Sequence, residues 1–211
     1  MSGIGDSGVQ VPREQMLLSR VKDIIVQPRS EWPLIEREST TVARLYVGYI
    51  IPLSAIPPVA SFIGMAVFGI SIPLLGTYRV PMVPALSSAV VQYVLGLVGV
   101  YALALIIDAL APTFAGQKNH VQALKVAAYS STASWLAGIF ALVPSLRWLS
   151  ILGLYGLYLL YVGLPIVMKS PAEKALGYTL VVIVCAIVIF VVIGAIVGRF
   201  VTYPTMGAFQ Q

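Results

Sequence analysis

The sequence contains little charge. Charged residues make up 10% of the 211-residue chain and apolar residues 59%, whereas soluble proteins carry about 25% charged and about 45–50% apolar residues. Twelve of the 21 charged side chains lie within the first 44 residues, which leaves nine for the other 167. Because nine charges cannot cover a water-facing surface, the composition excludes a soluble globular enzyme, a disordered protein and a nucleic-acid-binding domain.

Reactive side chains are also scarce. Cys185 is the only cysteine, which excludes an internal disulfide and a cysteine-rich metal site. His120 is the only histidine, and no acidic cluster accompanies it to form a metal site or a catalytic pair. The sequence contains no nucleophile-elbow, zinc-protease or phosphate-loop motif. We therefore expect no enzymatic activity, no cofactor and no metal, and we interpret His120 as a solvated loop residue.

Five charge-free runs are each long enough to cross a bilayer, whose core of about 30 Å requires about 20 helical residues. They cover residues 45–78, 80–107, 126–146, 148–168 and 175–198. Backbone groups in lipid must hydrogen-bond within their own segment, so these runs predict helices. The predicted fold class is an all-α integral membrane protein with five transmembrane helices, which together form a domain over 43–200. The expected spans are 43–66, 85–110, 122–145, 147–168 and 175–199.

The first run is too long for one straight helix and too short for two spans with a turn between them. It contains prolines at positions 52, 57, 58 and 73. Each proline removes a backbone donor and bends or ends a helix. We interpret this run as one kinked span at 43–66, followed by an irregular or half-inserted piece that continues to Pro84. Two short helices are the alternative.

Basic residues lie mostly on one side of the five predicted spans. With the N terminus in the cytoplasm, ten Lys and Arg residues are cytoplasmic and three are outside, as the positive-inside rule requires. A sixth span within 45–78 would move four lysines outside. The charges therefore predict a cytoplasmic N terminus and a C-terminal tail, 201–211, on the outer side. Residues 1–12 are small and polar, so we expect no cleavable signal.

The residues before the first span predict a helical cytoplasmic head over 14–42, after a flexible tail at 1–13. Leu17, Val21 and Ile24 recur at helical spacing, which predicts an amphipathic helix from Glu14 to Gln27. The six basic and six acidic residues before Leu45 cancel. This balance favours a head that lies on its own transmembrane bundle over one held by strong attraction to anionic lipid.

A second short helix is expected in the head after Pro28, which ends the first one. Ser30 lies where an N-cap residue is expected, and the helix should continue to about Glu38. Pro28 and Trp32 are the candidate interfacial residues. We predict that Trp32 and Ile35 face the bilayer surface.

Four stretches resemble motifs of a known membrane-protein family. They are IIVQPRSEWPLI (24–35), APTFAGQ (111–117), AAYSSTASWLAGIFALVP (127–144) and LYGLYLLYVGLPIVMKSPAEKALGY (154–178). In order and spacing they are similar to the Yip-type domain family, named for membrane proteins that interact with Ypt/Rab GTPases. The resemblance covers about residues 16–200. It implies five transmembrane helices and a cytoplasmic N terminus, in agreement with the charge count.

The resemblance also carries an expectation of function. The chain lacks the long hydrophilic N-terminal region of eukaryotic members and is similar to compact bacterial ones, which implies a multi-pass protein of the bacterial cytoplasmic (inner) membrane. Bacteria generally lack a Rab-controlled vesicle pathway, so the GTPase role is not transferred. The resemblance implies a non-enzymatic membrane organiser or partner-binding scaffold. The expected partners are the lipid bilayer and either a membrane protein or a second copy of the chain, and no nucleic acid.

Asp108 is the candidate ionisable residue inside the membrane. It is the only acidic residue between Glu38 and Glu173 and lies toward the cytoplasmic end of the second span. An ionisable group in lipid is costly and is a functional candidate. A buried carboxyl could take up a proton or bind a cation, which supports an alternative function as a small transporter or channel. The competing interpretation places Asp108 at the interface, paired with Lys118 or Lys125.

Hydroxyl-bearing side chains form two further candidate features. Tyr129, Ser130 and Ser131 begin a polar belt in the third span, which suits helix packing better than a substrate pocket. Tyr155 and Tyr158 belong to a tyrosine stripe in the fourth span. The stripe could line a cavity, although a packing face is the more common role of such a pattern.

Glycines mark candidate helix-packing positions. Gly194 and Gly198 have the small-xxx-small spacing in the last span, which suits either self-association or internal packing. Gly153, Gly156 and Gly163 lie beside the tyrosine stripe and would let another helix approach closely.

Overall fold

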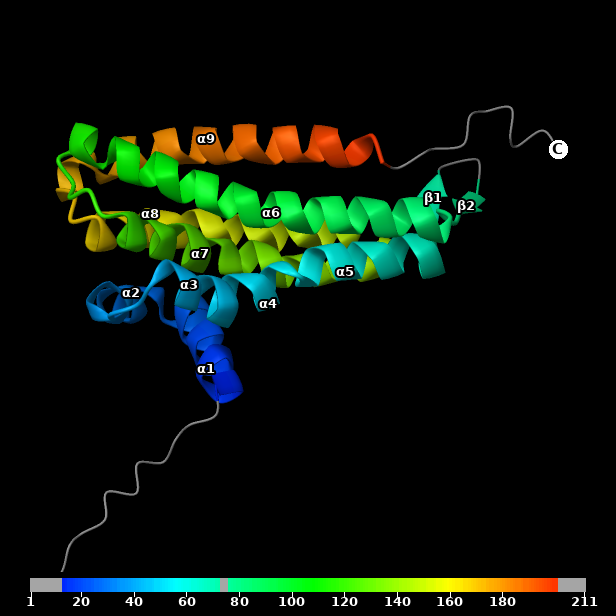
Figure 1. The fold of residues 1–211 in the computed structure, drawn as a ribbon, viewed down its shortest axis with the longest axis horizontal. Helices are drawn as coiled ribbons and strands as arrows, with labels where there is room; N and C mark the ends of the chain where they lie inside the picture. The colour runs from blue at the N-terminus through cyan, green and yellow to red at the C-terminus, as the bar shows by residue number, and fades with distance from the viewer. Residues whose placement is uncertain (1–12, 73–75, 201–211) are drawn as a thin grey trace, which may run out of the picture.

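The structure is a computed structural model that describes residues 13–72 and 76–200. Five long helical segments run antiparallel to their sequence neighbours (Figure 1). The first segment is Val42–Phe68, and the second is α6 (Met82–Leu110) with the 3₁₀ turn Ala111–Phe114. The third is α7 (His120–Ala137) with the 3₁₀ turn Gly138–Leu142. The fourth is the 3₁₀ segment Pro144–Leu154 followed by α8 (Tyr155–Val167), and the fifth is α9 (Ala172–Gly198). The predicted tails, apart from Arg13, and Pro73 lie outside the described residues.

The first long segment is interrupted, which is the effect expected of its prolines. It consists of α3 (Val42–Leu45), a π-helical turn (Tyr46–Ile50), α4 (Ile51–Ser54), α5 (Ile56–Ile63) and a second π-helical turn (Gly64–Phe68). Pro52 lies in the first turn of α4, and Pro57 and Pro58 lie in the first turn of α5. Proline is tolerated in a first turn because the missing N–H has no intrahelical partner there.

A short β-hairpin follows this segment and is a local feature, which the sequence did not predict, of an otherwise helical fold. Strands β1 (Ile70–Ile72) and β2 (Gly76–Tyr78) pair antiparallel, with Ser71 opposite Thr77. Gly69 ends the preceding helical turn with a φ of 81°, a left-handed value that favours glycine. The hairpin replaces part of the irregular piece predicted up to Pro84. Helical periodicity analysis missed it because each strand has only three residues.

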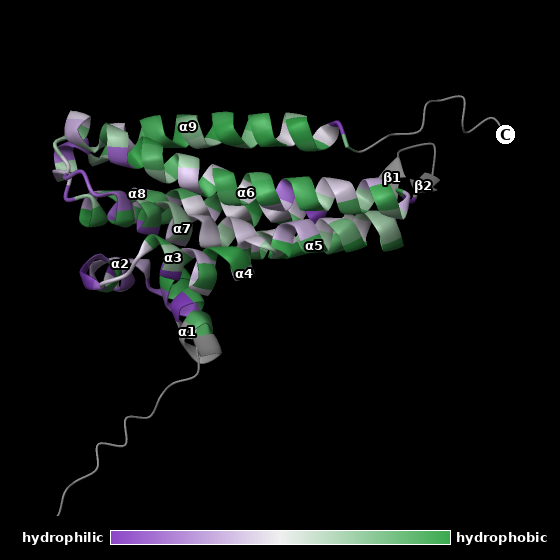
Figure 2. Ribbon diagram, in the orientation of Figure 1, coloured by the Kyte–Doolittle hydropathy of each residue, from purple (hydrophilic) through white to green (hydrophobic). Residues whose placement is uncertain are grey.

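Among the residues that the structure describes, four helices are long and apolar enough to cross a membrane. They are Val42–Phe68, Met82–Phe114, Ser145–Val167 and Ala172–Gly198, and Figure 2 colours most of the last of these, α9, as hydrophobic. The remaining long segment contains α7, in which 12 of 18 residues are buried. Since the neighbouring helices surround α7, its side chains meet protein, and a lower hydropathy is tolerated there.

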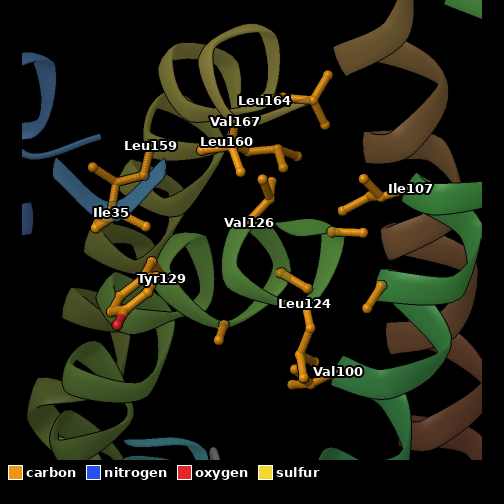
Figure 3. Packing of buried hydrophobic residues seen from close by; sticks show 14 of the residues in the cluster. Ile35, Val100, Ile107, Leu124, Val126, Tyr129, Leu159, Leu160, Leu164 and Val167 are labelled. Carbon is orange, nitrogen blue, oxygen red and sulfur yellow. The ribbon is translucent and has the colours of Figure 1, made fainter. Parts of the chain in front are cut away.

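The hydrophobic core surrounds α7 at the end of the bundle that carries the N-terminal helices, which we call the head end. Figure 3 shows Leu124, Val126 and Tyr129 of α7 among residues of α6, α8 and the N-terminal region. In contrast, α9 lies at the edge, and its most apolar window is only 6% buried. Its exposed Val, Ile and Phe side chains make a surface suited to lipid.

The N-terminal helices, α1 (Arg13–Val26) and α2 (Pro28–Arg37), lie outside the bundle at the head end (Figure 1). We call these two helices the head. The second helix begins at Pro28 and not after Ser30, whose hydroxyl instead donates to the Gln27 carbonyl. The prediction that Trp32 and Ile35 face the bilayer surface was wrong, because both are fully buried within the protein. The helix places these two apolar residues on the side that meets α7 and α8.

Candidate functional site

The head docks onto the bundle through the Trp32 side chain. A Cβ built on Gly163 of α8 would lie 2.2 Å from Trp32 Cε2, so only glycine leaves room for the indole there. On its other side, the Trp32 ring packs edge-on against Tyr129 of α7, with centroids 6.3 Å apart. The Trp32 ring of α2 therefore contacts both α7 and α8.

Tyr129 continues this contact into the first span. Its ring lies 4.5 Å from that of Tyr49, and the Tyr49 and Thr132 hydroxyls are hydrogen-bonded at 2.7 Å. Two further hydroxyls of the predicted polar belt have local partners. Ser130 and Ser131 both donate to the Ala127 carbonyl, which is back-bonding within their own helix.

Lys125 of α7 holds the end of α2. Its Nζ atom donates to the carbonyl oxygens of Ile35 (2.7 Å), Glu36 (3.3 Å) and Glu38 (2.6 Å). Lys125 is 2% exposed, so its ammonium group has lost most of its water. The three carbonyl oxygens take the place of that water as hydrogen-bond acceptors. A cation at the C-terminal end of a helix is also favourably placed in the helix dipole.

Arg20 of α1 ties the two head helices to each other. Its guanidinium donates to the Glu31 carboxylate and, at 2.8 Å, to Glu38 Oε2. Partial burial lowers the pKa of Arg20, but the attraction of Tyr129, Glu38 and Glu31 outweighs it, so the pKa is raised above its ordinary value. The guanidinium therefore stays charged, and Arg20, Glu31 and Glu38 form an ionic network. Lys169, after α8, adds an ion pair with Glu36 at 3.1 Å.

A cavity of about 590 Å³ lies beside this network, between α1 and the start of the first span. Its lining includes the charged residues Arg20, Glu38 and Arg44 and the aliphatic residues Leu17 and Val47. The rings of Tyr49 and Tyr129 complete the lining. The cavity therefore combines charged, aromatic and aliphatic side chains at the head end of the bundle.

The loops at the head end are joined by a second set of contacts. Gln117 N donates to the Met168 carbonyl at 2.7 Å, and Ser170 Oγ donates to the Phe114 carbonyl at 2.7 Å. Phe114 stacks on Tyr178 of α9 with centroids 4.8 Å apart and an interplanar angle of 7°. These contacts join the APTFAGQ stretch to the loop after α8 and to α9.

Asp108 is buried near the end of α6, where its Oδ1 atom has no hydrogen-bond partner among the described residues. The pairing with Lys118 or Lys125 that its sequence position suggested is not formed in the described part of the chain, and Lys125 binds the α2 carbonyls instead. The neighbouring Tyr178 hydroxyl donates to the Ile107 carbonyl. Asp108 lines neither the 590 Å³ cavity nor the apolar groove described next.

The tyrosine stripe lies mostly on the outside of the protein. Tyr155 and Tyr158 are exposed, with ring centroids 5.4 Å apart. The Tyr155 hydroxyl donates to the Ile25 carbonyl at 2.9 Å, which ties α1 to α8. Tyr155 also lines an apolar groove of about 420 Å³ together with Ile25 and Phe140.

The glycines of α8 and α9 differ in their surroundings. A Cβ at Gly156 would meet the Ser130 carbonyl oxygen at 2.6 Å, so this glycine permits close contact with α7. A Cβ at Gly153 would also meet α7, at 3.1 Å from Ser134 Cα. A Cβ at Gly194 or Gly198 would meet no atom within 4 Å in the described part of the chain. These last two glycines lie on a surface without internal contacts.

The structure reveals roles that the sequence did not assign. The sequence identified Arg20 only as a topology charge and offered Asp108 as a partner for Lys125. Nothing in the spacing of these two residues indicated their actual partners in α2 and directly after it. His120 was interpreted as a solvated loop residue, but it begins α7, packs edge-on against Tyr101 with centroids 5.1 Å apart, and has a buried Nε2 atom. Among the described residues, that atom has no hydrogen-bond partner.

Comparison with known proteins gives a consistent result. The family model for the Yip1 domain matches residues 22–193. The chain is 26% identical to "Inner membrane protein YohC" of Escherichia coli strain K12 over 166 residues, which cover 77% of this chain and 85% of that protein. The protein of the same name from E. coli O6:H1 gives the same values. No solved structure matches the chain.

Proposed function

Because the chain belongs to the Yip1 domain family, we propose that it is a non-enzymatic organiser of the bacterial inner membrane that binds a partner protein through its head. The docking of Trp32 against Gly163 is the observation that carries this proposal. A binding surface that is fixed before its partner arrives avoids much of the entropic cost of association. A head held by this contact suits a scaffold.

The outer side of the head has apolar residues that do not contact the bundle. Leu18 is 66% exposed, Val26 64% and Leu34 57%. They alternate along α1 and α2 with the inward-facing residues that join the core, such as Ile24 and Ile35. Exposed apolar side chains beside charged ones suit a protein or membrane-surface contact.

The proposed topology has five spans, with the head in the cytoplasm and the C terminus outside. Four helices have the length and apolarity of spans, and α7 is the fifth because it lies enclosed between them. The lysines at positions 118, 125, 169 and 174 lie near the α6–α7 and α8–α9 connections, which are at the head end in Figure 1. Arg79 and Arg199 follow β2 and α9, and Arg147 lies in the 3₁₀ segment Pro144–Leu154 before α8, which are at the opposite end. This distribution follows the positive-inside rule. The E. coli relative is named an inner membrane protein, which supports the same location for this chain.

The experiment that tests the proposal is extraction of the tagged chain from native membranes in polymer nanodiscs, with quantitative mass spectrometry of the companions. The informative variant is Leu18→Glu/Leu34→Glu, which changes only exposed side chains of the head. The control is Lys22→Glu/Arg37→Glu, which alters the charge of the head and keeps its exposed apolar residues. We expect one stoichiometric companion that the wild type and the control retain and the leucine variant loses. A companion that all three retain equally would contradict binding through the exposed leucines.

A second candidate function is transport of a small solute or ion. The buried Asp108 carboxyl, with one oxygen that has no partner in the described part of the chain, favours this alternative. A carboxyl in such a place is a functional candidate in a membrane protein. Flux into proteoliposomes that is lost in Asp108→Asn and kept in Glu173→Gln would support transport. Equal flux in both variants would exclude a role for Asp108.

A further inference from the structure

We propose that the 590 Å³ cavity binds the headgroup of a phospholipid that carries both a phosphate and a primary ammonium group. A cavity of this size is within the range of small-molecule sites, about 300–1,000 Å³. Its lining brings together two arginines, a glutamate, a serine, a threonine, two tyrosines and several aliphatic side chains. This lipid site does not depend on the partner protein proposed above.

Arg44 provides the phosphate-binding part of the site. Its side chain is exposed in α3 and forms no ion pair with any residue that the structure describes. Ser39 and Thr40 line the same cavity and offer hydroxyl donors. A guanidinium group binds two phosphate oxygens at once, which gives strong and directional contacts. Arg20 also lines the cavity and adds a second positive charge.

Glu38 provides the ammonium-binding part. One of its oxygens accepts from Arg20 at 2.8 Å, and the side chain is 42% exposed, so the carboxylate has lone pairs left for another donor. Arg20 is paired with Glu38 and with Glu31, which lies behind the lining, so these two carboxylates balance the charges of Arg20 and Arg44. A site with balanced charge suits a zwitterionic headgroup better than an anionic one. A primary ammonium can donate hydrogen bonds to Glu38, and a quaternary ammonium cannot.

The position of the cavity favours a lipid over a soluble phosphate compound. Arg44 lies at the start of the first span, Val42–Phe68, at the depth where headgroups lie. Leu17, Leu45 and Val47 line the cavity beside the charged residues, and Val47 is 63% exposed on the outer surface of that span. An acyl chain that continues along the span would contact these side chains while its headgroup occupies the charged part. Basic pockets beside spans are known to bind lipid headgroups.

Native mass spectrometry of the full chain in detergent micelles tests the proposal. Phosphatidylethanolamine, phosphatidylcholine and phosphatidylglycerol are added separately, and phosphoethanolamine is added as a competitor without acyl chains. Arg44→Gln removes the phosphate contact, with Arg37→Gln as the control because Arg37 is exposed outside the cavity. Gly48→Leu fills the cavity, since Gly48 lines it and a Cβ there meets no atom within 4 Å. Gly96→Leu is its control, because a Cβ at Gly96 also meets nothing.

We expect one bound phosphatidylethanolamine, held about tenfold more tightly than phosphatidylcholine or phosphatidylglycerol, as one additional charge-assisted contact would give. Arg44→Gln and Gly48→Leu should each weaken its binding by about tenfold or more, and the two controls should not. Thermal unfolding of all four variants shows whether they are folded. Equal binding of all three lipids, equal binding by wild type and both cavity variants, or full displacement by phosphoethanolamine would each overturn the proposal.

Discussion

The indole of Trp32 occupies the space where a side chain on Gly163 would lie. Its Cε2, Cζ2 and Cδ2 atoms are 2.2, 2.4 and 2.5 Å from the position of a Cβ on that glycine. The two residues are 131 positions apart in the sequence, and they belong to two stretches that resemble the same family. This contact makes the head part of the bundle, and several measurable consequences depend on it.

Gly163→Ala should push Trp32 out of its place. A methyl group forced against a buried ring costs about 1–3 kcal/mol when the core cannot adjust. We expect the free energy of unfolding in detergent to fall by that amount and the tryptophan emission to shift to longer wavelength as Trp32 meets water. Gly96→Ala is the control, since a Cβ there meets nothing and alanine favours a helix by about 0.5–1 kcal/mol. Equal stability of the two variants would argue against a tight contact at Gly163.

Lys125→Met should loosen the end of α2. The change removes the donor that serves three carbonyls, and each carbonyl is left without that partner. An unmade buried hydrogen bond costs about 1–3 kcal/mol, so we expect a loss of at least that size in a denaturant titration. Lys118→Met provides the comparison, because Lys118 is exposed and its removal should have little effect. If Lys125→Met is as stable as the wild type, the carbonyl contacts do not hold the head.

Tyr178→Phe should weaken the contact between α6 and α9. The hydroxyl donates to the Ile107 carbonyl, while the ring stacks on Phe114. Phenylalanine keeps the ring contact and removes only the hydrogen bond, which contributes about 0.5–1.5 kcal/mol. Thermal unfolding of this variant can be compared with Tyr161→Phe, since Tyr161 is exposed and donates no hydrogen bond in the described residues. A larger loss in Tyr161→Phe than in Tyr178→Phe would contradict the prediction.

Asp108→Asn should not destabilise the protein. The Oδ1 atom of Asp108 has no partner among the described residues, so the substitution breaks no hydrogen bond at that atom. It also removes the free-energy cost of burying an ionisable group. We expect the free energy of unfolding to stay the same or to rise. Glu173→Gln, an exposed change in the first turn of α9, should lower it by only a few tenths of a kcal/mol through the helix dipole. A loss above about 1 kcal/mol in Asp108→Asn would indicate a partner that stabilises the carboxylate.

Much of the helical architecture could be predicted from local sequence. The charge-free runs predicted the long segments of the bundle because lipid requires about 20 apolar residues for a span. The prolines indicated the interruption of the first segment. Glycines beside the tyrosine stripe predicted close helix approach, and Gly156 does lie against the Ser130 carbonyl. These features depend on residues within one helix, so periodicity and composition are sufficient.

The direction in which the head faces could not be predicted in this way. Trp32 and Ile35 form an apolar side of α2, and such a side can face either lipid or protein. The choice depends on Gly163 and Lys125, which lie far away in the sequence and contact α2 only in the folded bundle. The β-hairpin was missed for a different reason, since two strands of three residues give too few positions for an alternating pattern.

Hydrogen exchange of the full chain in lipid nanodiscs tests most directly whether the head is a fixed part of the bundle. The amides of α2, Pro28–Arg37, should exchange as slowly as those of α7, because Trp32 and Lys125 hold the two helices together. In Gly163→Ala, α2 should exchange faster while α7 stays protected. Wild-type α2 amides that exchange as fast as an unstructured peptide, or that do not respond to Gly163→Ala, would contradict a docked head.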